Sequence, residues 1–254
     1  MPLKSPKAQI IGLILPENID LVDGFQQCDL LELRFDLFPR TEWDAALMRV
    51  KEQWPSHPLI ATIRLQRDGG AWPDVQREER EPFLEVLATS GSVEWIDAEL
   101  QYPEWARRLI EISSKRTKIL ISSHDLKGSP GSLAEYEEFW KSATALKGDG
   151  IKLVVTFPQQ TLCANGGDKG ASAPNLISRE RDLYTFIEHH RDDPRLLAAF
   201  AMGEAGRATR IESVRRGAPW CYGFVGRHAP AAGQWSVHEL QRLFAKLRGP
   251  NMEG

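Results

Sequence analysis

The sequence predicts an α/β protein, specifically a (β/α)8 TIM barrel, on the basis of three observations. Short apolar runs alternate with longer amphipathic segments along the chain. About eight of these runs can be counted, at the intervals typical of βα units. Most of the runs are continuously apolar, which is typical of parallel strands covered by helices, because antiparallel strands with one wet face alternate more strictly. Eight such units close most naturally into a barrel.

A doubly wound open sheet is the alternative fold for the same alternation. That fold would place Gly-x-Gly-x-x-Gly after the first strand, whereas residues 15–18 read Leu-Pro-Glu-Asn. The barrel is therefore favoured. Its strands are expected at residues 10–15, 30–35, 59–64, 93–100, 118–122, 151–157, 196–202 and 220–225.

Helices are expected between these strands. Two of them begin with capping-box spacing, Ser132 with Glu135 and Ser236 with Glu239. In this arrangement a hydroxyl and a carboxylate satisfy free amides of the first helical turn. Amphipathic segments at residues 43–54, 78–87 and 105–112 predict three further helices.

The whole chain, residues 1–254, is expected to form this one barrel domain, because 254 residues can bury a core of that size. Residues 158–174 are too long and too glycine-rich for a tight connection, so we expect a mobile surface loop there. Residues 249–254 are expected to form a flexible tail.

The overall charge and the cysteines exclude several classes of partner. Lys and Arg number 32 and Asp and Glu number 35, a net charge of -3, so we expect no nucleic-acid or membrane partner. The three cysteines, Cys28, Cys163 and Cys221, are far apart and lack paired metal-ligand spacing, so we expect neither a disulfide framework nor a metal site. The apolar run at 10–15 is too short to span a membrane, and a cytoplasmic location is expected.

One lysine, Lys152, lies inside the otherwise apolar, β-branched run at residues 151–157. A buried ammonium loses hydration that few contacts replace, so its presence needs a reason. One reading places the lysine near a strand end with its charge in water. The other holds that burial and nearby cations lower its pKa, leaving a neutral amine that attacks a carbonyl. The run by itself favours neither reading.

Other polar residues lie near the carboxyl ends of expected strands, where the active sites of barrels are found. Each has a simpler explanation: Glu32 and Arg34 can form a plain ion pair, and Arg64 can cap a helix. A histidine after a strand is also more often packed or solvated than catalytic. Their concentration at one rim nevertheless favours function, because unrelated charges would scatter over both strand ends. The set comprises Glu32, Arg34, Arg64, Asp68, His124 and Arg210, together with Lys152.

These residue types share a chemical logic. A neutral lysine adds to a ketone to give a protonated Schiff base, which acidifies the neighbouring C–H. A histidine can take that proton and return one to a leaving hydroxyl. Arginines bind a carboxylate bidentately and disfavour protonation of the lysine. After the seventh strand, Gly203 and Gly206 are expected to let a loop turn tightly before Arg210. The set predicts imine chemistry on a small anionic ketone.

Six short motifs occur in order over most of the chain. They read Glu-Leu-Arg-Phe-Asp at 32–36, Thr-Ile-Arg at 62–64, Ser-Ser-His-Asp at 122–125, Ile-Lys-Leu-Val at 151–154, Met-Gly-x-x-Gly-x-x-Thr-Arg at 202–210 and Gly-Gln at 233–234. Together these motifs resemble those of the type I 3-dehydroquinate dehydratases, the Schiff-base enzymes of the shikimate pathway. The resemblance implies a (β/α)8 barrel, a small-molecule substrate, no cofactor and a homodimer.

The resemblance also implies a role for each site residue. Lys152 would form the imine with the C3 ketone of 3-dehydroquinate, and His124 would be the general acid and base at C2 and at the C1 hydroxyl. Asp68 stands where an acidic residue, more usually glutamate, orients the histidine in the family. The ring hydroxyls would be held by Glu32, Arg34 and Arg64, and the substrate carboxylate by Arg210 and Gln234.

One loop departs from the family pattern Ser-Ala-Pro-Gly-Gln, because residues 230–234 read Pro-Ala-Ala-Gly-Gln. Pro230 replaces a substrate-binding serine, so one hydrogen bond is absent or is supplied from elsewhere, by His228 or Arg227. We expect residues 227–234 to close over the ligand as a lid.

Two other functions stay open at this stage. One is another class I imine-forming lyase or aldolase on the same barrel, although three arginines favour a carboxylate over a neutral sugar. The other is a non-catalytic barrel that binds a shikimate-type metabolite, although a binder needs neither the lysine nor the histidine. The sequence does not separate aromatic biosynthesis from quinate breakdown, since both use the same reaction.

Overall fold

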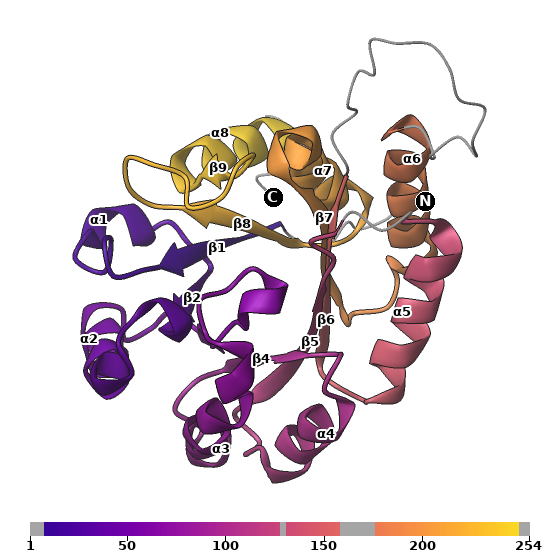
Figure 1. The fold of residues 1–254 in the computed structure, drawn as a ribbon. Helices are drawn as coiled ribbons and strands as arrows, with labels where there is room; N and C mark the ends of the chain where they lie inside the picture. The colour runs from indigo at the N-terminus through magenta and orange to yellow at the C-terminus, as the bar shows by residue number, and fades with distance from the viewer. Residues whose placement is uncertain (1–7, 128–130, 158–175, 249–254) are drawn as a thin grey trace, which may run out of the picture.

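Nine parallel strands form one curled sheet in the computed structural model, which describes residues 8–127, 131–157 and 176–248 (Figure 1). Each of the eight expected strands is present, with ends shifted by at most two residues. The strands are β1 Gln9–Ile14, β2 Leu30–Arg34, β3 Leu59–Thr62, β4 Trp95–Glu99, β5 Lys118–His124, β6 Gly150–Thr156, β7 Leu196–Met202, β8 Trp220–Phe224 and the unexpected β9 Trp235–Ser236.

The order of the strands brings the end of the sheet back to its beginning. The order is β7-β6-β5-β4-β3-β2-β1-β8-β9, so β1 pairs with β2 on one side and with β8 on the other. Ile11, for example, lies opposite Leu30 of β2 and opposite Tyr222 of β8. An open doubly wound sheet does not return its last strands to its first one, so the predicted TIM barrel is confirmed.

Side chains on the inner face of the curled sheet pack against one another. In its apolar cluster, the rings of Phe200 on β7 and Tyr222 on β8 lie 6.0 Å apart between centroids. β7 and β8 therefore meet through side chains, although they are not neighbours in the hydrogen-bonded order. The cluster draws on all eight long strands and includes Ile11, Leu13, Leu30, Ile60, Trp95, Leu120, Val154, Ala198, Phe200, Trp220 and Tyr222.

The short strand β9 lies beside the end of β8, close to the point where β7 leads into helix α7 (Gly203–Arg216). Just before β9, the Gly233 amide donates a hydrogen bond of 2.8 Å to the Glu204 carboxylate. A Cβ on Gly233 would lie 2.0 Å from the Gly203 carbonyl oxygen, so only glycine permits this approach. The segment thus bridges β8 and β7. A two-residue strand is too short to give a sequence pattern.

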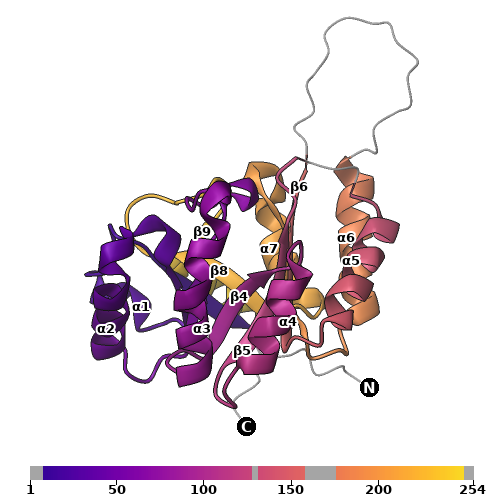
Figure 2. The same ribbon diagram turned by 60° about the horizontal axis from the view of Figure 1, so that its bottom comes forward.

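Helices lie on the outer side of the curled sheet, and their apolar faces form the main core with the outward side chains of the strands (Figures 1 and 2). Both predicted capping boxes are present, at Ser132 with Glu135 and at Ser236 with Glu239. Besides α7, the α-helices of the described residues are α1 Val22–Phe25, α2 Trp43–Gln53, α3 Glu81–Ser90, α4 Pro103–Ile112, α5 Leu133–Ala145, α6 Leu176–His190 and α8 Val237–Arg248. The two capping boxes precede α5 and α8.

Two expectations concern residues outside the described ranges, namely the surface loop at 158–174 and the tail at 249–254. The assignment of residues 1–254 to one domain also stays a prediction. None of the helices in the described ranges is long and apolar enough to cross a membrane.

Candidate active site

One pocket lies at the carboxyl ends of the strands and reaches into the barrel. Because all strands are parallel, side chains that are distant in the sequence meet at this end. The pocket is lined by every residue that the sequence singled out as a candidate, together with apolar side chains of β1, β6 and β7. These eight candidates are Glu32, Arg34, Arg64, Asp68, His124, Lys152, Arg210 and Gln234.

Lys152 lies on β6 and is only 5% exposed. Its Nζ lies 3.4 Å from Asp97 Oδ2, 3.7 Å from Glu32 Oε2 and 4.4 Å from the centroid of the Tyr222 ring. The lysine therefore does not hold its charge in bulk water. The groups in contact with Nζ are thus two carboxylates and an aromatic face, rather than the nearby cations that the sequence led us to expect.

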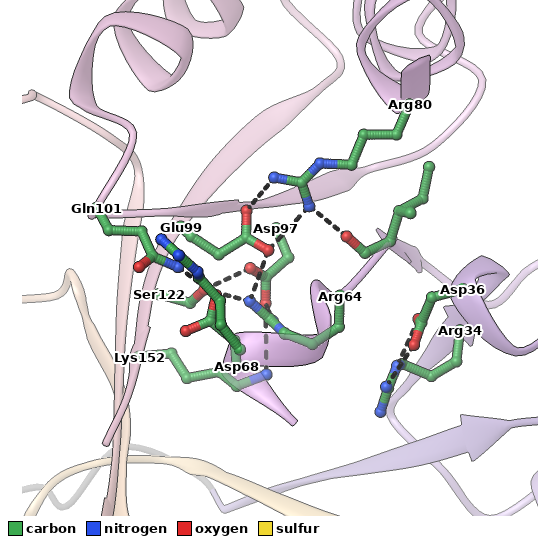
Figure 3. Close-up of polar contacts among 12 residues, drawn as sticks. Arg34, Asp36, Arg64, Asp68, Arg80, Asp97, Glu99, Gln101, Ser122 and Lys152 are labelled. Carbon is green, nitrogen blue, oxygen red and sulfur yellow. Dashed lines mark hydrogen bonds and ion pairs between the residues drawn. The ribbon is translucent and has the colours of Figure 1, made fainter. Parts of the chain in front are cut away.

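Asp97 on β4 joins Lys152 to Arg64. Its Oδ2 accepts a hydrogen bond from Arg64 and its Oδ1 accepts one from the Ser122 hydroxyl, while Arg64 Nη1 donates to Ser122 Oγ at 2.9 Å (Figure 3). Burial alone would raise the pKa of Asp97, but the charges of Arg64 and then Lys152 outweigh it and hold that pKa far below its usual range. The side chain is therefore a carboxylate across the neutral pH range.

A second ion pair, with Glu99, also holds Arg64 in place. Arg64 Nη1 lies 3.4 Å from Glu99 Oε1, and Glu99 accepts hydrogen bonds of 2.9 and 2.7 Å from Arg80 (Figure 3). Arg80 is 1% exposed and also donates to the Ile63 carbonyl. Since every charge in this buried network has a partner of opposite sign, the network holds Arg64 in one orientation.

Asp97 and Glu99 were not among the predicted site residues. Both interrupt the apolar run at 93–100 with the two-residue spacing that places them on one side of a strand. A charged residue inside an apolar strand, as at Lys152, needs a partner, and this signal also identifies Asp97 and Glu99. Tyr222 had no comparable signal, since tyrosine is common in strands.

His124 is the last residue of β5. Its Nδ1 is buried and has no hydrogen-bond partner among the described residues. Burial, and after it the charges of Arg64 and Lys152, lowers the pKa of His124 well below its ordinary value. The imidazole is therefore neutral near pH 7 and is able to accept a proton.

Asp68 lines the same pocket, but within the described residues no hydrogen bond joins it to His124. Its Oδ2 instead accepts a hydrogen bond from the Gln101 amide (Figure 3). Burial and then the charge of Glu99 raise the pKa of Asp68 to about 6. The structure thus lacks the contact through which Asp68 was expected to orient the histidine.

Arg34, at the end of β2, is directed toward Asp36. Its Nε and Nη2 donate hydrogen bonds of 2.9 and 2.8 Å to the two carboxylate oxygens, apart from the network around Arg64 (Figure 3). The same carboxylate accepts a hydrogen bond of 3.0 Å from the Ala71 amide. The pair therefore ties the segment after β3 to the end of β2 at the rim of the pocket.

Arg210 lies on helix α7, which begins at Gly203, so the prediction of a loop between the seventh strand and this residue is wrong. Gly206 serves close packing instead, because a Cβ there would lie 2.4 Å from the Ala201 carbonyl. Arg210 is 4% exposed, and its guanidinium lies 4.2 Å from the centroid of the Phe200 ring. Burial lowers the pKa of Arg210 to about 10, and no carboxylate of the described residues pairs with it. The pocket thus contains an uncompensated cation.

Gln234 is also buried, and its Oε1 has no hydrogen-bond partner in the part of the chain that the structure describes. Ala231 lines the pocket nearby, whereas Arg227, His228 and Pro230 are exposed and do not line it. Neither Arg227 nor His228 therefore takes the place of the missing serine in this structure.

Within the described ranges, no group of three or more histidine, cysteine, aspartate or glutamate side chains is arranged to hold a metal ion. Cys28 and Cys221 are buried free thiols, and Cys163 lies outside the described residues.

A buried lysine, a neutral histidine and an uncompensated arginine in one pocket suit imine chemistry on an anionic ketone. The family model described as type I 3-dehydroquinase matches residues 15–161 and 169–249. The chain belongs to the type I 3-dehydroquinase family. The matched segments contain all eight candidate residues, and the resemblance inferred from the six motifs is confirmed.

Curated relatives of two kinds are similar to this type I 3-dehydroquinase chain. A 3-dehydroquinate dehydratase from Methanopyrus kandleri is 26% identical over 243 residues, which cover 94% of the chain and 98% of the relative. A pentafunctional AROM polypeptide from Komagataella phaffii is 36% identical over 241 residues, which cover 93% of the chain but 14% of the relative. The chain therefore spans about one seventh of the length of the AROM polypeptides that it matches.

Solved structures share the fold. A 3-dehydroquinate dehydratase from Geobacillus kaustophilus superposes with a TM-score of 0.80 at 21% identity, covering 97% of this chain and 93% of that one. A type I 3-dehydroquinate dehydratase from Clostridium difficile gives a TM-score of 0.77 at 20% identity, covering 95% and 92%. At these identities the likeness establishes the barrel, and the family model establishes the family.

Proposed function

We propose that the chain is a 3-dehydroquinate dehydratase, which converts 3-dehydroquinate to 3-dehydroshikimate and water through an imine on Lys152. Membership of the type I 3-dehydroquinase family supports the reaction. The observation that carries the mechanism is that the buried Lys152 shares one pocket with the neutral His124 and the unpaired Arg210. A nucleophile, a proton carrier and a carboxylate receptor are what this dehydration requires.

The reaction begins at the C3 ketone. The neutral Lys152 amine adds to the carbonyl carbon, and the carbinolamine loses water to give an iminium. The positive nitrogen acidifies the C2–H bond, and loss of that proton gives a neutral enamine. The enamine electron pair expels the C1 hydroxyl, which leaves as water with an added proton. Hydrolysis of the conjugated iminium consumes one water, frees the lysine and releases the enone, so the net loss is one water.

His124 carries the protons in this scheme. Its lowered pKa keeps the imidazole neutral before catalysis, so it can accept the proton from C2. The imidazolium then returns that proton to the leaving C1 hydroxyl. Asp97 and Glu32, 3.4 and 3.7 Å from Lys152 Nζ, stabilise the positive nitrogen of both iminium states.

The other polar groups of the pocket hold the substrate. Arg210 lacks a carboxylate partner in the described residues, and with Gln234 it would bind the substrate carboxylate. The remaining groups, Glu32, Arg34 and Arg64, would bind the ring hydroxyls. We also propose Asp68 as a catalytic residue, held in the pocket by the hydrogen bond that its carboxylate accepts from Gln101.

Borohydride reduction in the presence of 3-dehydroshikimate tests the proposal. Mass analysis of the peptides should place one reduced adduct on Lys152, and Lys152→Met should abolish both the adduct and the rise in enone absorbance. Lys118→Met, on the neighbouring strand and outside the pocket, is the matched control and should retain both. Active protein with an unmodified Lys152 would refute the imine mechanism.

His124→Ala tests the division of roles between nucleophile and proton carrier. The variant should still trap product on Lys152, while turnover should fall by about 100- to 10,000-fold. Loss of trapping in a folded His124→Ala variant would show that the histidine is needed for imine formation itself.

We also propose that residues 227–234 close over bound substrate. Support comes from the exposed Arg227, His228 and Pro230 beside the buried, pocket-lining Gln234. Amide hydrogen exchange in this segment should slow when substrate or product binds, and unchanged exchange would contradict a lid.

We further propose that the enzyme acts in the cytoplasm as a homodimer, in keeping with its family. The free thiols of Cys28 and Cys221 accord with a reducing compartment. Light scattering of the purified protein tests the dimer, and fractionation of the source cells tests the location.

A further inference from the structure

Tyr222 is a pocket residue to which the proposed mechanism gives no role. It lies on β8, faces the interior of the barrel and is 4% exposed. Its ring centroid lies 4.4 Å from Lys152 Nζ, within the range of a cation–π contact. The ring therefore touches the atom at which the imine would form.

The ring belongs to a tilted aromatic pair whose two members contact the two cations Lys152 and Arg210. Phe200 lies 6.0 Å from Tyr222 between ring centroids, and the Arg210 guanidinium lies 4.2 Å from the centroid of Phe200. Lys152 and Arg210 thus each face one ring of the pair. Such contacts gain strength where water is excluded, as it is around these buried side chains.

The Lys152 nitrogen changes its charge during the proposed reaction. It is neutral when it attacks the ketone, positive in the first iminium, neutral in the enamine and positive again in the conjugated iminium. An aromatic face stabilises the positive forms over the neutral ones because the face of the ring carries partial negative charge. A ring at this position therefore favours the two intermediates through which the dehydration passes.

The hydroxyl of Tyr222 gives a second way for this residue to act. The oxygen is buried and interacts with Glu32. Burial and then the charge of Glu32 raise the pKa of Tyr222 well above its ordinary value, so the group stays a neutral phenol. The ring faces the Lys152 nitrogen at 4.4 Å, whereas the hydroxyl interacts with Glu32, so the ring is the part of Tyr222 that lies against the reacting atom.

We propose that Tyr222 is a further catalytic residue, whose ring face stabilises the positive charge on the Lys152 nitrogen in the iminium intermediates. This inference rests on the imine mechanism proposed above. It assigns the effect to the π face rather than to the hydroxyl.

The test replaces Tyr222 by phenylalanine, by mono-, di- and trifluorinated phenylalanines, and by leucine. Fluorine withdraws density from the ring face with little change in shape, so a structural role would not respond to it. The borohydride-trapped fraction of Lys152 and kcat should fall stepwise with each added fluorine. Tyr222→Leu should lower both by about 10- to 30-fold, and Tyr222→Phe should stay within about threefold of the wild type.

Tyr136→Leu is the matched control. Tyr136 is another buried tyrosine, packed against Phe186 in the cluster between α5, α6 and the outer face of the sheet, and it does not line the pocket. Its loss should lower the denaturation midpoint as Tyr222→Leu does, while the trapped fraction stays at the wild-type level. Circular dichroism of each variant shows that it is folded.

Three results would overturn the inference. Equal trapping by the phenylalanine and trifluorophenylalanine variants would show that the ring face carries no charge-dependent effect. A loss in Tyr222→Phe as large as in Tyr222→Leu would assign the effect to the hydroxyl. Wild-type protein that turns over substrate without a trappable Lys152 adduct would refute the imine mechanism itself. This experiment is done first, before any variant is made.

Discussion

Asp97 Oδ2 lies 3.4 Å from Lys152 Nζ and also accepts a hydrogen bond from Arg64, so one buried carboxylate serves two cations. The Lys152 nitrogen is thereby held next to a negative charge that suits an iminium. Arg64 in turn is fixed by Asp97 on one side and by Glu99 on the other. The carboxylate that contacts the proposed nucleophile therefore also holds Arg64, which we propose binds a ring hydroxyl of the substrate.

Asp97→Asn should destabilise the protein in a manner that depends on pH. The folded-state pKa of Asp97 lies below its unfolded value of about 4, so its stabilisation is present above that value and is lost as pH falls toward the folded pKa. At pH 7 the variant should lose about 3 to 5 kcal/mol of unfolding free energy, because two buried cations lose a partner. Urea denaturation should show this difference shrinking below about pH 4; a difference that stays constant with pH would contradict the assignment.

Asp68→Asn should have the opposite sign. The pKa of Asp68 is raised to about 6, so the folded protein binds more protons than the unfolded chain between about pH 4 and 6, and the carboxylate costs stability as pH rises through this window. The amide can still accept the hydrogen bond from Gln101. The variant should therefore be more stable than wild type by about 1 to 3 kcal/mol at pH 7 and equally stable near pH 4. Denaturation midpoints of the variant and the wild type at pH 4 and pH 7 test this prediction. A variant that is less stable than wild type at pH 7 would refute the raised pKa of Asp68.

Arg80→Met should remove the support behind Arg64. The side chain is fully buried and donates two hydrogen bonds to Glu99, so its loss leaves Glu99 with Arg64 alone, at 3.4 Å. We expect a loss of about 3 to 5 kcal/mol in unfolding free energy, together with a raised KM. The double variant Arg80→Met, Glu99→Gln should recover part of the stability, because it no longer buries an under-compensated charge. A double variant no more stable than the single one would argue that packing, rather than charge, explains the loss.

Arg210→Gln should weaken substrate binding with little effect on imine chemistry. The guanidinium is buried without a carboxylate partner in the described residues, and its pKa of about 10 leaves it charged at neutral pH. Losing a charged bidentate contact should raise KM by at least about tenfold. At saturating product, borohydride should still trap the imine on Lys152 of the variant. Arg207→Gln, on the same helix but outside the pocket, is the control and should leave KM unchanged. A normal KM in Arg210→Gln would place the substrate carboxylate elsewhere.

The strands and most of the pocket were predictable because their signals are local. Continuous apolar runs place the strands, and parallel strands carry residues such as Arg34, His124 and Lys152 to one end of a barrel whatever the loops between them do. Gly206 was misread because a glycine that permits a tight turn and a glycine that permits close helix packing look the same in a sequence. Only the neighbouring Ala201 carbonyl, 2.4 Å from the position of a Cβ, distinguishes the two.

The sequence by itself determined the barrel, the family and eight of the residues that line the pocket, since these depend on apolar periodicity and on short ordered motifs. The tertiary structure decided which of them touch. Asp97 and Lys152 are 55 residues apart, and Arg80 reaches Glu99 across a helix–strand interface; such contacts arise from how the sheet curls. The pairing of Asp68 with Gln101 and the ring of Tyr222 under Lys152 are likewise set by distances across the barrel, which no local pattern encodes.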